Sequence, residues 1–399
     1  MSTADEALAT AHRQYFGRLV GWLFRYCGDL QVAEDAVASA FASAVTRWRA
    51  SGVPDSPEAW LRVASRNSAL SALRVASRNL NTAPEDFESW EAAETPVAAM
   101  DERLGLLFVC AHPALDPRIH APMMLQAVLG IDAARIASAF LARPSTMGQR
   151  LSRAKAKIRD AGIRYRVPEA PELPQRLEPV LQAIYACYGV GDPVAAETQD
   201  RDADLREEAI RLARLMVDVM PDHPECLGLL ALLLHTESRR PARVIDGRFV
   251  PLAEQDTSLW LSDLRREANS LLERASAAGS LGRFQLEAAI SAAHSARADG
   301  HPTDWATVVT LYSGVLSIAP SIGAAVGAAS ARSEAGDPGA ALALLDELPS
   351  ESVATYQPYW VCLAQVLRAL GKVDAAASAQ SRAVGLTQNP AVRAYLLGP

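Results

Sequence analysis

The chain lacks the features that mark membrane proteins, secreted proteins and metalloproteins. Its 399 residues include five cysteines, which form neither a CxxC pair nor a group with histidines at metal-ligand spacing. No stretch approaches the roughly 20 apolar residues of a membrane span, and residues 1–18 lack a signal-peptide pattern. We therefore expect a protein of the reducing cytoplasm with buried thiols and no metal site.

Catalytic motifs are also lacking. The sequence has no Gly-rich phosphate loop, no ordered set of Ser, His and Asp, and no paired carboxylates within a motif. His112 precedes Pro113 and suits a structural turn, while His120, His223 and His235 are isolated along the chain. The sequence thus predicts no cofactor and favours a protein that is not an enzyme. An enzyme that works by shape and hydrogen bonding alone would leave no motif and stays open.

The sequence also lacks the alternation of apolar and polar residues that is typical of β-strands. Almost every segment is rich in Ala, Leu and Arg at helical periodicity, which predicts an all-α fold. Two stretches interrupt the helical pattern: the acidic residues 81–99, and residues 166–175, which contain three prolines. We expect four segments in consequence, namely a helical domain over 1–80, a linker over 81–99, a second helical domain over 100–166 and a helical extension over 176–399.

Charge is distributed unevenly along the chain. Residues 1–166 carry 20 Lys and Arg against 17 Asp and Glu, a net charge of +3. Residues 167–399 carry 19 Lys and Arg against 29 Asp and Glu, a net charge of −10. The total charge of −7 is therefore the sum of a basic first region and an acidic second half. Residues 141–166 alone contain eight basic residues and one acid. Nucleic acid is expected to bind the first half.

Residues 129–159 predict a helix-turn-helix that ends in a basic helix. Asp132 can cap the first helix, on which Ile136 and Phe140 lie four apart on one face. The run 141–144 breaks the pattern, and Ser145 opens a second helix. Met147, Leu151 and Ile158 point inward from it, and its outer face carries Gln149, Arg150, Arg153, Lys155, Lys157 and Arg159. Such a face suits a DNA major groove, although an amphipathic helix facing water would have the same pattern.

The C-terminal half predicts further helices and a weak internal repeat. The motif at 336–341 recurs at 371–376, a spacing of 35 residues, and each copy separates two Ala/Leu-rich helices. This spacing is close to the period of tetratricopeptide repeats, in which paired helices stack into a solenoid. Residues 241–260 lack helical rhythm and are expected to form an ordered surface loop.

Taken together, these motifs resemble an extracytoplasmic-function sigma factor, of the sigma-70 family, with a C-terminal tetratricopeptide-like extension. The resemblance covers nearly the whole chain. Residues 30–48, 52–55, 59–61 and 65–67 match sigma region 2, and residues 101–104, 112–115, 146–151 and 153–155 resemble region 4. Residues 208–214, 227–233, 240–243, 254–256 and 260 resemble the extension.

The resemblance implies a function and a set of site residues. Region 2 would bind core RNA polymerase and open the promoter −10 element, and region 4 would read the −35 element. The implied polymerase contacts are Glu34, Asp35 and Phe41. The implied DNA contacts are Ser145, Thr146, Gln149, Arg150, Arg153 and Lys157 in region 4, with Arg62, Arg66, Arg74 and Trp60 in region 2. Trp48 and Trp60 bracket residues 49–57, which could hold an unstacked base, or else both rings pack in the core.

Several polar contact positions of the family pattern are changed in this chain. Ala38 and Ser39 replace the usual Gln-Glu, the run 66–75 lacks an Asp and two basic residues, and residues 187–191 replace a hallmark of the extension. Each lost phosphate contact would weaken DNA binding.

Three hypotheses remain from the sequence. The first is an alternative sigma factor that is regulated by its own C-terminal half and by an effector of small-molecule or protein type. The second is a repurposed sigma-like protein that no longer transcribes and binds or transforms a small molecule in a helical interdomain cleft. Its candidate residues are Tyr185, Tyr188, Asp256 and Trp260. The third is a peptide-binding scaffold on the solenoid.

Overall fold

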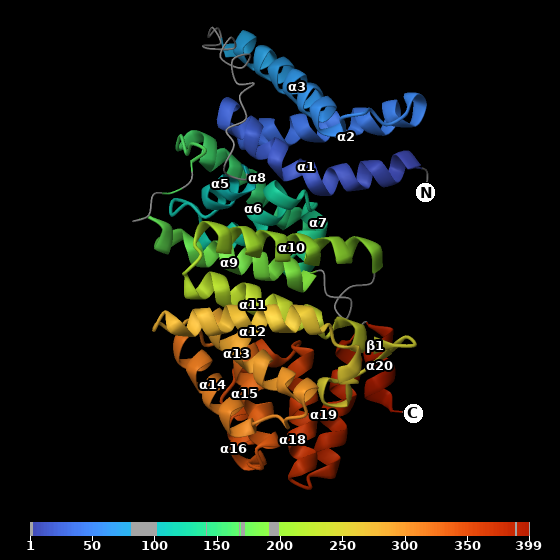
Figure 1. Cartoon of the computed structure of the whole chain (residues 1–399), viewed down its shortest axis with the longest axis vertical. Coiled ribbons are helices and arrows are strands. Elements are labelled where there is room, and N and C mark those ends of the chain that lie inside the picture. Colours follow the sequence, from blue (N-terminus) through green and yellow to red (C-terminus); the bar gives the residue numbers. More distant parts are fainter. Residues whose placement is uncertain are drawn as a thin grey trace. The chain divides into compact units, whose positions relative to one another are not determined.

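The computed structural model describes residues 3–80, 102–140, 142–166, 168, 172–190, 199–387 and 389–398, so the linker expected over 81–99 lies outside the described residues. Helices make up most of this part of the chain (Figure 1). The strands found among the described residues are two short ones, paired in a hairpin. The all-α prediction is therefore confirmed. The chain divides into two compact units, residues 1–190 and 191–399.

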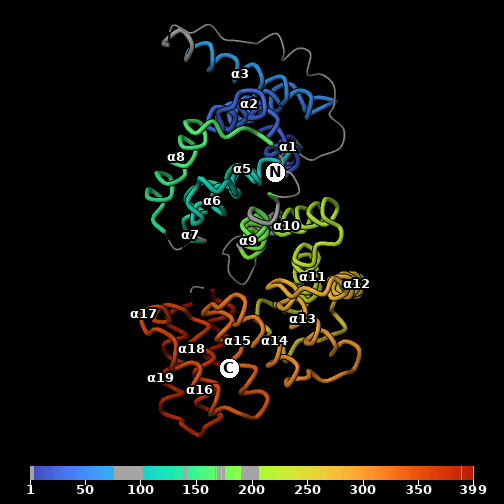
Figure 2. Tube along the Cα trace, turned by 90° about the vertical axis from the view of Figure 1, so that its left-hand side faces the viewer, coloured from blue at the N-terminus to red at the C-terminus, as the bar shows by residue number. Residues whose placement is uncertain are grey.

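The first unit contains two groups of helices. The N-terminal group consists of α1 (Thr3–Cys27), α2 (Leu30–Ser51) and α3 (Pro57–Leu80). The second group consists of α5 (Glu102–Cys110), α6 (Pro117–Leu129), α7 (Ala133–Ala139), α8 (Pro144–Asp160) and α9 (Leu173–Val190). Helix α1 contacts α5 and α6, and α2 contacts α8, so the two groups pack on one another (Figure 2).

Two glycines of α1 let the groups approach closely. A Cβ atom added at Gly17 would collide with the carbonyl oxygen of Val128, near the end of α6. A Cβ at Gly21 would lie 2.7 Å from the carbonyl oxygen of Glu102, at the start of α5. Because the two glycines are four residues apart, they lie on one face of α1. That face carries backbone-to-backbone packing that any larger residue would prevent.

Local signals in the sequence explain α7 and α8. The Asp132 carboxylate accepts hydrogen bonds from the backbone N–H groups of Ala134 and Arg135, both at 3.0 Å, so the predicted cap is confirmed. Helix α8 begins at Pro144, one residue before the expected Ser145, since proline is well suited to the first position of a helix. Ile136 is buried and Phe140 is 37 % exposed, so the two residues expected on one face of the helix differ in their burial. Phe140 follows the last residue of α7, so helical periodicity no longer sets its direction.

Helix α9 was expected to open the C-terminal extension. In the structure it contacts α5 and α6 and belongs to the first unit. Its buried side includes Leu177, Leu181 and Ile184. The proline-rich segment before it therefore does not mark the boundary between the compact units.

The second unit is a succession of helices. These are α10 (Gln199–Val219), α11 (Pro224–Ser238), α12 (Ser262–Ala277), α13 (Arg283–Ser295), α14 (Trp305–Ile318), α15 (Ile322–Glu334), α16 (Pro338–Asp346), α17 (Ser350–Val353), α18 (Gln357–Ala369), α19 (Val373–Leu386) and α20 (Pro390–Leu397). Neighbouring helices pack in pairs, α15 with α16 and α18 with α19 (Figure 2). The two recurring motifs start at Gly336 and Gly371, whose positive φ angles of 91° and 72° let the chain turn from one helix into the next. The tetratricopeptide assignment itself stays a prediction.

The segment 241–260 is ordered and more structured than the loop that we expected. It contains β1 (Val244–Ile245) and β2 (Arg248–Phe249), joined by Asp246 and Gly247 with φ angles of 49° and 74°. Two residues with positive φ are what a tight two-residue hairpin turn requires. Three short 3₁₀ turns flank it at Arg240–Ala242, Leu252–Glu254 and Thr257–Leu259. The Arg297 guanidinium donates to the backbone carbonyls of residues 252, 253 and 255 and holds the segment in place.

No helix in the described ranges is both long enough and apolar enough to span a membrane.

Candidate nucleic-acid and polymerase interface

The outward face of α8 carries the residues that were predicted to contact DNA. Ser145, Gln149, Arg150, Arg153 and Lys157 are exposed, and Thr146 is half-buried. Met147, Leu151 and Ile158 are buried on the opposite side, as the periodicity predicts. The exposed side is therefore a continuous polar and cationic surface along the helix.

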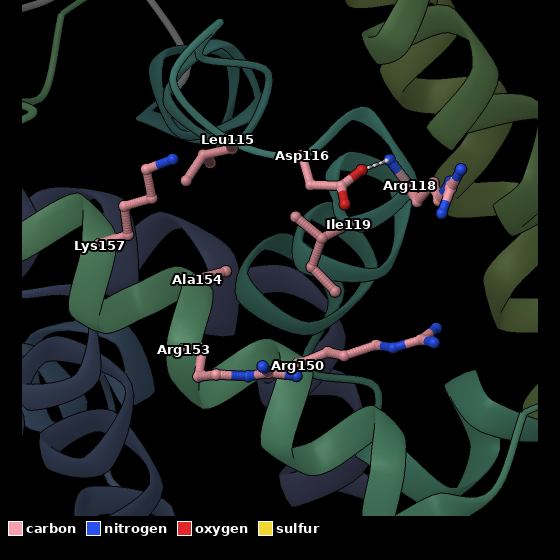
Figure 3. Close-up of a pocket in the computed structure, with 8 residues that line it drawn as sticks. All are labelled: Leu115, Asp116, Arg118, Ile119, Arg150, Arg153, Ala154 and Lys157. Carbon is pink, nitrogen blue, oxygen red and sulfur yellow. Dashed lines mark hydrogen bonds between the residues drawn. The ribbon is translucent and has the colours of Figure 1, made fainter.

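A hollow of about 290 Å³ lies between this face and the start of α6 (Figure 3). Arg150, Arg153 and Lys157 approach it from α8, and Arg118 approaches it from α6. Asp116 caps α6 by accepting a hydrogen bond of 2.9 Å from the Arg118 backbone N–H. Leu115, Ile119 and Ala154 complete the lining. Four cationic side chains against one carboxylate make the hollow suited to an anion such as a phosphate group.

The sequence reasoning missed Arg118. It lies 32 residues before Arg150, outside the basic run 141–166, so its charge did not stand out. The Asp116-Pro117 pair just before it is a recognisable helix start, and it would have placed Arg118 in the first turn of a helix.

The other side of α8 packs on α2 through a buried ion pair. The Lys155 ammonium donates to the Glu34 carboxylate, and these residues are only 6 % and 8 % exposed. Burial raises the pKa of the Glu34 carboxyl group, while the charge and hydrogen bond of Lys155 act in the opposite direction. At the end of α8 the Arg159 guanidinium lies 3.9 Å from the Asp29 carboxylate, which also caps α2. The sequence assigned Lys155 to the outer face; this assignment is wrong, because α2 covers that side of the helix.

The residues that were expected to bind polymerase differ in their exposure. Glu34 is paired with Lys155, and Phe41 is 7 % exposed and packs near the rings of His12 and Phe16. Asp35 remains exposed and accepts a hydrogen bond of 2.9 Å from the Gln31 side chain. The expected polymerase contacts are thus split in this conformation, with Asp35 accessible and the other two buried.

The aromatic residues beside the loop 52–56 pack on one another. Trp48 is 2 % exposed, and its ring lies 5.9 Å from that of Trp60 in an edge-to-face arrangement. The open slot for a flipped base that we considered is therefore absent in this conformation, because Trp48 belongs to the core of the helical group. Trp60 is half-buried.

The arginines of α3 have different surroundings. The Arg62 guanidinium lies 4.6 Å from the centroid of the Trp22 ring. Arg66 is half-buried and Arg74 is exposed. Arg66 lies four residues after Arg62 and eight before Arg74, so each of these two pairs shares a side of α3, whereas Arg62 and Arg74 are about 120° apart around the helix. Their role in following a DNA strand stays a prediction.

The four residues of the alternative small-molecule reading fall in different compact units. Tyr185 is half-buried and Tyr188 is buried on α9, in the first unit. In the second unit, Asp256 caps a 3₁₀ turn by accepting a 2.9 Å hydrogen bond from the Ser258 N–H. Trp260 is buried with the Arg297 guanidinium 5.8 Å from its ring centroid. Asp256 and Trp260 thus have structural roles, and the interdomain cleft itself stays a hypothesis.

His112 also has a structural role. Its Nδ1 accepts a hydrogen bond of 3.1 Å from the Ala114 N–H, within the turn that was expected there. Among the described residues, no group of three or more His, Cys, Asp or Glu side chains is arranged to hold a metal ion.

Comparison with known families identifies the N-terminal helices. The family model for sigma-70 region 2 matches residues 11–79, and a model described as a family of unknown function (DUF6596) matches residues 176–276. Two probable ECF RNA polymerase sigma factors named SigI, from Mycobacterium tuberculosis strains CDC 1551 / Oshkosh and ATCC 25618 / H37Rv, are 31 % identical over 176 residues. That match covers 41 % of this chain and 58 % of each relative. No solved structure matches the chain significantly.

Helices α1–α3 thus correspond to a sigma-70 region 2 domain, which supports a protein of sigma-70 type. A full-length relative is the uncharacterized protein R00370 of Rhizobium meliloti (strain 1021), which is 35 % identical over 401 residues, 98 % of this chain and 94 % of the relative. The chain belongs to the same family as R00370.

Proposed function

We propose that the protein is an alternative sigma factor of the extracytoplasmic-function type, which directs core RNA polymerase to specific promoters. The observation that carries the proposal is the cationic face of α8 with its hollow, in a chain whose N-terminal helices match sigma-70 region 2. The α7–α8 pair acts as a helix-turn-helix that reads the −35 element. Helix α3 follows the −10 strand, and α2 contributes the polymerase contact.

The positions of the polar residues along α8 suggest which of them contact bases and which contact phosphates. Ser145, Thr146 and Gln149 lie in the first turns of the helix, where a recognition helix contacts base edges. Arg118, Arg150, Arg153 and Lys157 surround the hollow and bind phosphates. If each of these four cations neutralises one phosphate, the binding constant falls with salt at a log–log slope of about −3.6. A rise from about 50 to about 200 mM salt then weakens binding about 100-fold.

The closed packing of α2 on α8 implies a regulated protein. Glu34 becomes available to the polymerase only when α8 moves away from α2. The DNA-facing side of α8 is exposed already, so opening affects polymerase binding first. We propose that the second unit controls this opening, in line with the net charge of −8 on residues 191–399, which is complementary to the cationic hollow.

The test combines co-purification with core RNA polymerase and an electrophoretic shift on the DNA upstream of the protein's own gene, at two salt concentrations. The double variant Arg150→Gln/Arg153→Gln should weaken the shift and flatten its salt slope by about two units. Arg164→Gln is the matched control, because Arg164 is exposed just beyond α8 and does not line the hollow. A monodisperse protein with neither polymerase binding nor a shift would contradict the proposal and favour a sigma-like protein with another role.

A further inference from the structure

The second unit contains a ligand-sized hollow that the proposed function does not use. It consists of two adjoining spaces of about 490 and 380 Å³. The two spaces share five of their lining residues, namely Phe249, Val361, Gln365, Tyr395 and Leu396. These residues come from the hairpin strand β2, from α18 and from the C-terminal helix α20, which lies beside β2 (Figure 1).

The walls of the hollow are held in place by specific contacts. The Phe249 and Tyr395 rings meet edge to face with centroids 5.6 Å apart. The Gln380 side-chain amide, on α19, donates a 2.6 Å hydrogen bond to the Leu396 backbone carbonyl. The Asn389 side chain caps α20 by accepting from the Ala391 and Val392 N–H groups. A hairpin, a helix pair and a capped terminal helix thus form a preorganised site from segments far apart in the sequence.

The larger space is lined by two arginines and, among the described residues, by no acidic side chain. Arg248 and Arg368 line it, and both are exposed. Within the described part of the chain neither guanidinium takes part in a salt bridge or a side-chain hydrogen bond, and neither space is lined by Asp or Glu. Burial raises the pKa of Tyr395, the charge of Glu254 raises it further, and the charge of Arg368 lowers it. Two unpaired guanidinium groups therefore face a space that has an apolar floor.

We propose that this hollow binds a small organic acid. The carboxylate accepts hydrogen bonds from Arg248 and Arg368, and the apolar body lies on Phe249, Val361 and Leu396. Arginine is the side chain best suited to a carboxylate, because its planar fork can donate two parallel hydrogen bonds. The volume falls within the range of sites that hold small organic ligands. The side-chain amides of Gln365 and Gln380 also line the larger space and can form hydrogen bonds with further polar groups of the ligand. This site does not depend on the protein being a sigma factor.

The test uses the full chain and a matched pair of probes, 1-naphthaleneacetate and the neutral 1-naphthaleneethanol. Saturation-transfer NMR titrations measure the affinity of each. The acid should bind about tenfold more tightly than the alcohol, since hydrogen bonds to a charged group are the strong ones. In the Arg248→Gln/Arg368→Gln variant this preference should disappear.

The control variant is Arg332→Gln, because Arg332 lies on α15 and lines neither space. It should keep the preference for the acid. Circular dichroism and the thermal midpoint should show that all variants fold alike. The proposal is overturned if the acid does not bind at about 2 mM, if acid and alcohol bind equally well, or if the double variant and the control lose affinity together.

Discussion

The buried pair of Glu34 and Lys155 offers the sharpest prediction about the first unit. Lys155→Met removes the ammonium group and leaves a carboxylate that is buried with no counter-charge. Breaking a buried pair from one side costs about 3–5 kcal/mol. The α2–α8 contact should weaken by up to this amount, since separating the helices returns the carboxylate to water. Such a change raises the open population by a factor of about 100 or more.

The double variant Glu34→Gln/Lys155→Met should recover most of the loss, because both charges are then gone and only a polar amide remains to be buried. Chemical unfolding of the wild type, Lys155→Met, Glu34→Gln and the double variant gives the coupling energy between the two residues. Hydrogen exchange of α2 and α8 separates opening of this contact from global unfolding. Lys157→Met is the matched control on the same helix. Lys157 is exposed, so its loss should change stability by less than about 0.5 kcal/mol.

The reasoning would be refuted by single variants that behave like the wild type, or by single effects that simply add in the double variant. Either result would mean that Glu34 and Lys155 do not meet in a low-dielectric contact.

Three further predictions concern packing, pH and thiols. Gly17→Ala should increase hydrogen exchange in α1 and α6, because the new methyl group collides with the Val128 carbonyl; an unchanged exchange pattern would mean that the helices do not approach so closely. Burial, with the charges of Arg239 and Arg265, lowers the pKa of His235 from 6.5 to about 3. As the pH falls, His235 therefore binds a proton in the unfolded state before it does so in the folded state. The free energy of unfolding of the second unit should stay constant above about pH 6.5, fall by about 2 kcal/mol by pH 5 and approach a loss of about 5 kcal/mol near pH 3. His235→Leu should flatten this profile in acid unfolding experiments, and a profile that is already flat in the wild type contradicts the shift. Cys27 should react first with a thiol reagent, because it alone among the described cysteines is partly exposed; equal rates for all five would contradict the burial of the others.

Sequence patterns were sufficient for the local features of the fold. Asp132 caps α7 as predicted, and Met147, Leu151 and Ile158 are buried, because these features depend on residues within a few positions of one another. The hairpin at 244–249 also had a local signal, Asp246-Gly247, which is a favoured two-residue turn. The sequence analysis expects only a loop there, because the segment lacks helical periodicity.

The errors have a common physical cause. A lysine on a helix looks like a solvent-facing residue, yet Lys155 is buried because Glu34, 121 residues earlier, lies opposite to it. Likewise Arg118 joins the α8 cations only through the packing of α6. Periodicity tells which side of a helix is apolar or charged. It does not tell which helix will cover a given side, and the candidate site depends on that long-range pairing.

The most direct test of the proposed function is the affinity for core RNA polymerase of the wild type, Lys155→Glu and Lys157→Glu. Lys155→Glu places two carboxylates in the α2–α8 contact and should open it, exposing Glu34. We expect wild-type binding to be measurable, Lys155→Glu to bind at least about tenfold more tightly, and Lys157→Glu to match the wild type. Absence of binding by all three proteins, or equal binding by Lys155→Glu and the wild type, would contradict a sigma factor whose polymerase-binding surface is covered by its own helix.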